Sequence, residues 1–167
     1  MPFGAHAAPD SNMISAVFDT NLLVSAFLSR DNPDGVSNEL LRFARHGAVQ
    51  LHLSPEIVAE TLSTLVGSER AQRRYGYTPT MALQFCEDLL TTGTVVVNPP
   101  PTPGAVPRDP DDDMIVACAV AASVQYIVSR DRDLLSLGSS HAIKIIAPEI
   151  FIQIVRRDHG RLPDTEA

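Results

Sequence analysis

The chain alternates between short apolar runs and longer segments in which apolar positions recur with a helical spacing. The short runs are rich in β-branched residues, which predicts buried strands at residues 14–18, 49–53, 94–97, 126–129 and 143–146. Between them, apolar residues return every three or four positions, which predicts helices at residues 22–29, 38–47, 55–66, 80–90, 114–122 and 149–157. A shorter helical turn is expected at residues 133–138, and another turn or short helix within residues 68–78.

Residues with helix-capping preferences mark several of these boundaries. Ser54 precedes Pro55, and Thr78 precedes Pro79, so that each pair matches an N-cap followed by proline at the first helical position. Ser37 is the expected N-cap of the second helix, which Gly47 should end.

The order of elements predicts the fold class. Strands that alternate with helices, with no hairpin turn between them, indicate a three-layer α/β/α arrangement around a mostly parallel sheet of about four or five strands. Right-handed crossovers would place the carboxyl ends of these strands at one edge, where open α/β sheets bind ligands. We expect one domain at residues 13–157, a flexible extension at residues 1–12 and a tail at residues 158–167.

Composition narrows the class of protein. A length of 167 residues suits one domain, and 44% hydrophobic with 20% charged residues is typical of a soluble globular protein rather than a disordered one. No apolar run approaches the length of a membrane span. Cys86 and Cys118 lie in apolar helical segments, which favours buried thiols of a cytoplasmic protein. The net charge of −7 does not exclude a nucleic-acid ligand, because a metal site would concentrate negative charge locally.

Four acidic residues stand in otherwise apolar surroundings: Asp19, Glu60, Asp112 and Asp131. Each alone has an ordinary interpretation as a helix cap or a surface charge. As a group they need another interpretation, because the predicted topology brings at least three of them to the same sheet edge. Clustered carboxylates without a basic partner require a divalent cation, and hard oxygen ligands suit Mg²⁺ or Mn²⁺. Such a site can activate water and hold a phosphodiester for hydrolysis.

Four sequence blocks in order resemble the PIN domain, the fold of many prokaryotic toxin–antitoxin ribonucleases of the VapC type. They are VFDTNLLVSAFL (17–28), SPEIVAETLSTL (54–65), DPDDDMIVACAVAA (109–122) and YIVSRDRDLLSL (126–137). The blocks span nearly the whole chain from Met13 to about Val155. One block alone is weak evidence, whereas the ordered set is specific.

The resemblance implies roles for individual residues. Asp19, Glu60, Asp112 and Asp131 match the four acids that serve as catalytic residues and as ligands of Mg²⁺ or Mn²⁺. Asp113 competes with Asp112 for the third position, while Asp109 and Asp111 are interpreted as loop charges. Small polar positions that orient the carboxylates are matched as well; they are Thr20, Asn21 and Ser129.

The implied function is a metal-dependent endoribonuclease, the toxin of a toxin–antitoxin system, with RNA as substrate, a cognate antitoxin as a possible partner, and a homodimeric state. One alternative is a catalytically inactive PIN-like binding module. A second is a phosphotransfer enzyme or receiver that uses Asp19, which is disfavoured because Asn21 stands where a second aspartate is needed and Lys144 begins its strand. The sequence predicts neither the RNA target nor the number of metal ions.

Overall fold

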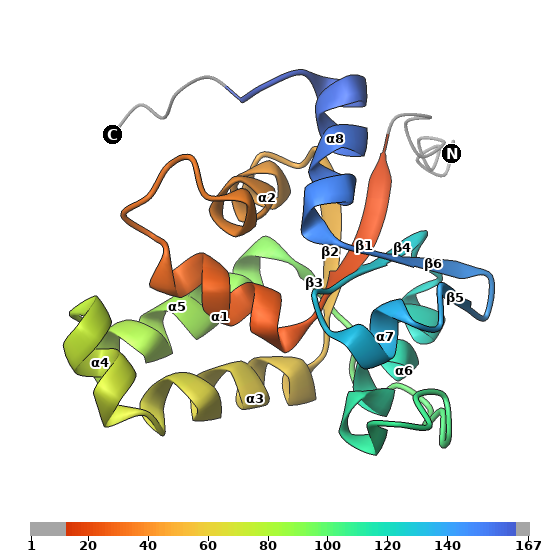
Figure 1. Cartoon of the computed structure of the whole chain (residues 1–167), viewed down its shortest axis with the longest axis horizontal. Helices are drawn as coiled ribbons and strands as arrows, with labels where there is room; N and C mark the ends of the chain where they lie inside the picture. The colour runs from red at the N-terminus through yellow and green to blue at the C-terminus, as the bar shows by residue number, and fades with distance from the viewer. Residues whose placement is uncertain (1–12, 163–167) are drawn as a thin grey trace, which may run out of the picture.

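A twisted sheet organises the part of the chain that this computed structural model describes, residues 13–162 (Figure 1). Within these residues the sheet has six strands in the order β3-β2-β1-β4-β6-β5. The strands are β1 Ile14–Phe18, β2 Val49–Leu53, β3 Thr94–Val95, β4 Tyr126–Val128, β5 Ser139–Ser140 and β6 Ile143–Ile146. The extension expected at residues 1–12 and the end of the expected tail lie outside the described residues.

The centre of the sheet is parallel, as the sequence predicts. β1 pairs with β2 through Ile14 and Val49, and with β4 through Ala16 and Tyr126. Four of the five residues of β1 are buried, which fits a strand covered by helices on both faces. The carboxyl ends of β1 and β4 therefore meet at one edge.

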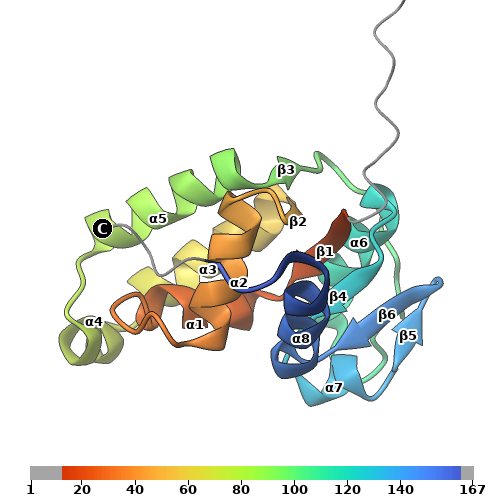
Figure 2. The ribbon, with the colours of Figure 1, turned by 90° about the horizontal axis from the view of Figure 1, so that it is seen from above.

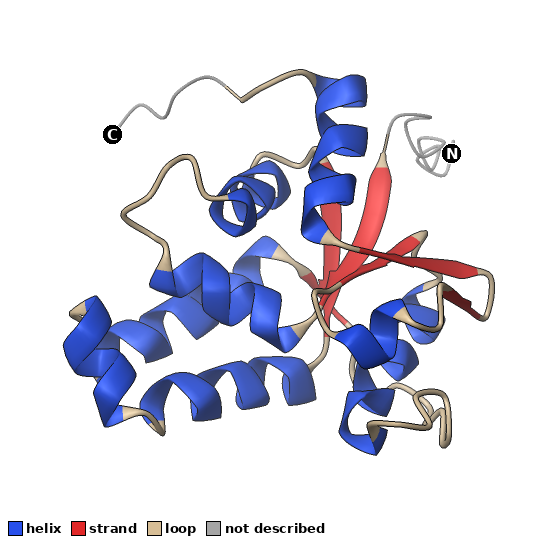
Figure 3. Ribbon diagram, in the orientation of Figure 1, coloured by secondary structure: helices blue, strands red, loops and turns tan. Residues whose placement is uncertain are grey.

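The helices cover both faces of the sheet and extend well beyond it. Seen from above, α6 lies on one side of β1 and β4, and α8 lies on the other (Figure 2). Helices α1, α3, α4 and α5 form a separate group beside the sheet, as colouring by secondary structure makes clear (Figure 3). The described helices are α1 Thr20–Leu28, α2 Val36–Arg45, α3 Pro55–Val66, α4 Glu69–Tyr75, α5 Pro79–Thr92, the 3₁₀ helix η1 Pro110–Asp112, α6 Asp113–Ala122, α7 Arg132–Leu135 and α8 Pro148–His159.

Local capping chemistry agrees with two of the predicted helix starts. The Ser54 hydroxyl accepts from the amide of Ile57 at 3.3 Å, and the Thr78 hydroxyl accepts from that of Met81 at 3.2 Å. Each cap satisfies an amide that has no partner within the first helical turn.

The core joins the sheet to its helices. Phe18, Phe43 and Phe151 are among its largest fully buried side chains. Cys86 and Cys118 are buried free thiols, as predicted. Within the described residues, every helix is too short or too polar to cross a bilayer.

Several element boundaries differ from the expectation by one to three residues; α2, for example, ends at Arg45 rather than at Gly47. Gly35, not Ser37, is the N-cap residue of α2; Ser37 is buried inside the first turn, where its hydroxyl donates to Ser25 Oγ at 3.2 Å. The third strand ends at Val95 rather than at residue 97, and α8 continues to His159, two residues into the expected tail.

An antiparallel hairpin between β5 and β6 is a further correction, because the sequence contains no standard hairpin signal there. The two turn residues are His141 and Ala142, with φ values of 51° and 64°. Such turns normally carry Asn or Gly, because positive φ is strained for most side chains.

Candidate functional site

Asp19 stands where the central strand ends. It follows β1, precedes the first residue of α1, and is only 3% exposed. Its backbone amide donates to the carbonyl of Val128 at 3.0 Å, which ties it to the end of β4. Its Oδ2 accepts a hydrogen bond of 2.6 Å from Ser129 Oγ, a residue 110 positions away in the sequence. The carboxylate is thus held in one orientation at the sheet edge.

Ser129 also positions the next acid. Its hydroxyl oxygen accepts from the amide of Asp131 at 2.9 Å. Asp131 caps α7, because its Oδ1 accepts from the amides of Asp133 at 2.8 Å and Leu134 at 3.3 Å. The cap bonds use only one carboxylate oxygen, so the other can face a ligand.

The 3₁₀ helix η1 brings two more acids to the same place. One carboxylate oxygen from each of Asp109, Asp112 and Asp131 lies within 4.8 Å of the other two. We call these three residues the aspartate trio. Asp109, which the sequence placed among the loop charges, is therefore part of the acidic cluster. Its position before Pro110 matches an N-cap, and its Oδ1 accepts from the amide of Asp111 at 3.2 Å; this cap signal could have identified it.

Asp112 is a partly buried carboxyl group among like charges. Burial, followed by the negative charges of Asp19, Asp131 and Asp109, raises the pKa of Asp112 to about 7. Its Oδ2 is buried and makes no hydrogen bond within the described residues. A buried acceptor of this kind normally has a partner.

Asp19 and Glu60 lie outside the aspartate trio but are coupled to it. Burial raises the pKa of Asp19, Ser129 opposes this by its hydrogen bond, and Asp131 and Asp109 raise it further. Glu60 is exposed on α3, and burial together with the charges of Asp19, Asp111 and Asp109 raises its pKa. No basic side chain contributes to the shifts of Asp19, Glu60 or Asp112.

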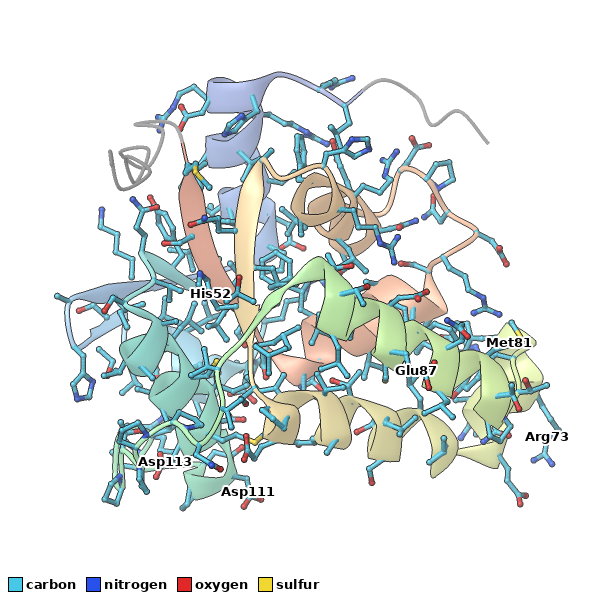
Figure 4. All side chains as sticks on the ribbon, turned by 180° about the vertical axis from the view of Figure 1, so that it is seen from behind. His52, Arg73, Met81, Glu87, Asp111 and Asp113 are labelled. Atoms are coloured by element: carbon cyan, nitrogen blue, oxygen red, sulfur yellow. The ribbon has the colours of Figure 1, made fainter. Side chains whose placement is uncertain are left out.

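Asp113, the expected competitor of Asp112, has different contacts. Its Oδ1 accepts from the amide of Val106 at 2.7 Å and its Oδ2 from that of Gly104 at 3.0 Å. Both oxygens thus anchor the loop before η1, and the view from behind shows Asp113 against that loop and Asp111 below it (Figure 4). Among the predicted orienting residues, Ser129 contacts Asp19. The Thr20 hydroxyl is buried and has no hydrogen-bond partner among residues 13–162, and Asn21 is exposed.

These features fit a hard divalent cation. The trio offers three carboxylate oxygens within the span of one coordination sphere, and Asp19 and Glu60 add charge at its border. A bound cation would supply the partner that Asp112 Oδ2 lacks and would favour the ionised form of each acid.

Comparison with known proteins gives one family and a fold. A family model described as the PIN domain matches residues 15–133. The crystal structure of PAE2754 from Pyrobaculum aerophilum is similar, with a TM-score of 0.54 and 16% identity over 86% of this chain and 90% of that one. VapBC2 from Rickettsia felis, bound to a DNA fragment from their promoter, matches with a TM-score of 0.54 and 14% identity over 80% of this chain and 98% of that one. No curated protein shows a significant match.

Proposed function

The chain belongs to the PIN domain family, and from this premise we propose that it is a metal-dependent endoribonuclease that hydrolyses phosphodiester bonds in RNA. The observation that carries the proposal is Asp112, a carboxyl group surrounded by three other acids and by no base, with one buried oxygen that lacks a partner. Such an arrangement suits Mg²⁺ or Mn²⁺, which prefer carboxylate oxygens.

The residues proposed to hold the ion are the predicted four, Asp19, Glu60, Asp112 and Asp131, together with Asp109. When bound, the ion would lower the pKa of a water and offset charge on the phosphate. Asp112 and Asp131 would orient it through the oxygens that no backbone amide occupies. Ser129 acts through Asp19, because its hydroxyl fixes the rotamer of that carboxylate.

Besides helping to hold the ion, Glu60 is proposed to move a proton, through the carboxylate oxygen that the ion does not occupy. It is exposed, it lies outside the trio, and its raised pKa makes it a better proton acceptor than an ordinary glutamate. In hydrolysis the water oxygen forms a bond to phosphorus and releases its proton to Glu60. The bond from phosphorus to the leaving oxygen breaks, and this oxygen takes up a proton from solvent.

The biological setting is proposed by analogy alone. VapBC2 shares only the fold with this chain at 14% identity, so its assembly does not transfer directly. We propose that this chain is likewise the toxin of a toxin–antitoxin pair, with a cognate antitoxin as partner. We also propose that it is a homodimer, for which the exposed apolar side chains of Leu83 and Leu90, seven positions apart on one face of α5, give an available surface. Light scattering after size-exclusion chromatography tests the oligomeric state.

Cleavage of labelled single-stranded RNA tests the nuclease proposal. With Mn²⁺ or Mg²⁺ the chain should cut, and EDTA should abolish cutting. Asp19→Asn and Asp112→Asn should each lower the rate roughly a hundredfold or more, since each removes a charge from the ion site. Asp31→Asn, a change in an exposed loop acid, is the matched control and should leave the rate unchanged.

Two outcomes would overturn the proposal. Cutting that persists in EDTA and in both variants would show that the acids do not hold a catalytic ion. Mn²⁺ binding without any cutting would favour the inactive binding module instead. The receiver alternative is opposed by the burial of Asp19 and its bond to Ser129, which leave little room for phosphorylation.

A further inference from the structure

A cavity of about 570 Å³ lies between the start of α3, the proline-rich loop that follows β3, and α6. Its walls are mostly apolar and include residues 99–101, Met114 and Ala117. Thr102 and Asp113 line it as well, and two further polar side chains reach it, those of Glu56 and Asn98. Both residues are exposed, and neither side chain has a hydrogen-bond partner within the described residues.

The cavity adjoins the acidic site on two sides. Asp113 forms part of its wall, and Asp112 of the aspartate trio is the preceding residue. On α3, Glu56 and Glu60 are four residues apart, so they share a face and are separated by about 6 Å along the helix axis.

Hydrogen bonds fix the wall of the cavity before any ligand arrives. Asp113 accepts from the amides of Gly104 and Val106, and its carbonyl accepts from Thr102 Oγ1 at 3.1 Å. Val106 is 1% exposed, so the loop is also held by a buried side chain. A proline-rich loop held at these points loses little conformational entropy when it binds, which favours affinity.

We propose that this cavity binds one unpaired nucleobase of the RNA substrate, next to the scissile phosphate, and that it selects guanine. The inference rests on the proposed function and names a specificity site for it. The proline rings, Met114 and Ala117 give apolar surface against which the face of a base can pack, and unstacked bases are the parts of single-stranded RNA that proteins read.

Guanine is singled out by the chemistry of Glu56. An ionised carboxylate only accepts hydrogen bonds, and its two oxygens match the adjacent N1–H and N2–H donors of guanine. Uracil presents one such donor between two carbonyl oxygens, which would repel the carboxylate. Asn98 can donate from its amide to the guanine O6 acceptor.

Nuclear magnetic resonance titration of the whole ¹⁵N-labelled chain tests the site without relying on cleavage. The ligands are guanosine 5′-monophosphate, uridine 5′-monophosphate and ribose 5-phosphate, each in EDTA. We expect the guanine nucleotide to move the amide peaks of Thr102, Met114 and Ala117 and to half-saturate at roughly a tenfold lower concentration than the uracil nucleotide. Ribose 5-phosphate, which has no base, should leave these peaks in place.

Glu56→Gln should remove the preference for guanine, because the amide keeps the size of the side chain and loses one acceptor. Glu69→Gln is the matched control, since Glu69 also lies in the first turn of an exposed helix and is absent from the cavity wall. Unmoved peaks elsewhere in the spectrum show that each variant is folded. Equal shifts with all three ligands, or a guanine preference that survives in Glu56→Gln, would overturn the inference.

Cleavage mapping separates this inference from the proposed function. A chain that binds the guanine nucleotide at these residues but cuts no RNA overturns the nuclease proposal and keeps the base site. A chain that cuts RNA with no guanine preference beside the cut, and with none of these peak shifts, overturns the base site and keeps the nuclease.

Discussion

Replacing Asp112 by asparagine should stabilise the protein in the absence of metal, although it should destroy catalysis. Asp112 shares its surroundings with Asp19, Asp131 and Asp109, and these charges together with burial raise its pKa from 3.8 to about 7. Above pH 7 the folded chain must hold an ionised group that it disfavours. Asparagine has almost the same shape and no charge, so it removes that penalty.

The magnitude follows from linkage between protonation and folding. The folded protein binds more protons than the unfolded chain between about pH 4 and pH 7, so this carboxyl makes the protein less stable as pH rises through that window. A pKa difference of about 3 corresponds to about 4 kcal/mol at most. Asp112 is only partly buried, and screening by solvent reduces this to about 2 kcal/mol. For a chain of this size, that is about 4–8 °C in Tm.

Urea unfolding followed by circular dichroism measures the effect. In EDTA at pH 8, Asp112→Asn should have a free energy of unfolding about 2 kcal/mol above that of the parent, and at pH 4 the two should be equal. Saturating Mn²⁺ should stabilise the parent and reverse the order at pH 8. A variant that is no more stable than the parent at pH 8 would refute the assignment of Asp112 as a strained, cation-requiring carboxyl.

Three further predictions concern a hydrogen bond in the site, two ion pairs elsewhere and ion binding. Ser129→Ala removes the donor to Asp19 and should lower the free energy of unfolding by about 1–3 kcal/mol; an unchanged urea midpoint would contradict this. Glu39→Gln breaks the ion pair with Arg156, in which the glutamate is largely buried, and should lower the free energy of unfolding by about 1–3 kcal/mol. Glu149→Gln breaks the exposed pair with Arg130 and should lower it by less than about 1 kcal/mol in the same urea titration. Mn²⁺ at a hundred times its Kd should stabilise the parent by about 2.7 kcal/mol in thermal unfolding, and a flat Tm would exclude a site.

The positions of two site residues, Asp19 and Asp131, could be predicted from the sequence. Asp19 follows a strand whose residues are all compatible with burial, so its place at the sheet edge follows from topology alone. Asp131 is defined in the same way by the end of β4. Strand ends in a parallel sheet are fixed by backbone pairing, which is why these two positions are predictable.

The positions of the remaining acids depend on local backbone geometry, which the spacing of residues along the sequence does not reveal. Asp109 enters the cluster because η1 forms a tight 3₁₀ turn, which a run of aspartates does not signal. Asp113 differs from Asp112 by one helical position, and only the backbone amides of the proline-rich loop decide which carboxylate is engaged. Glu60 was predicted to act with Asp19, Asp112 and Asp131; it is not one of the trio, and its charge is coupled to Asp19 and Asp109.

The β5–β6 hairpin was missed for a related reason. His141 and Ala142 adopt positive φ because the pairing of Ser139 with Lys144 and Ser140 with Ile143 holds the turn closed. Tertiary context here outweighs local preference, and no pattern within four residues records it.

The hydrogen bond between Ser129 and Asp19 spans 110 residues, and β1 and β4 pair across the same distance. During synthesis, Asp19 leaves the ribosome long before Ser129, the trio and β6 do. A nascent chain therefore cannot assemble the acidic centre until β4 and the residues just after it have emerged, and products truncated before β4 lack both Ser129 and Asp131. Contacts so distant in sequence also slow folding, because a long loop must close before they form. The connectivity of the sheet thus delays the appearance of the acidic centre until β4 has been synthesised and has paired with β1.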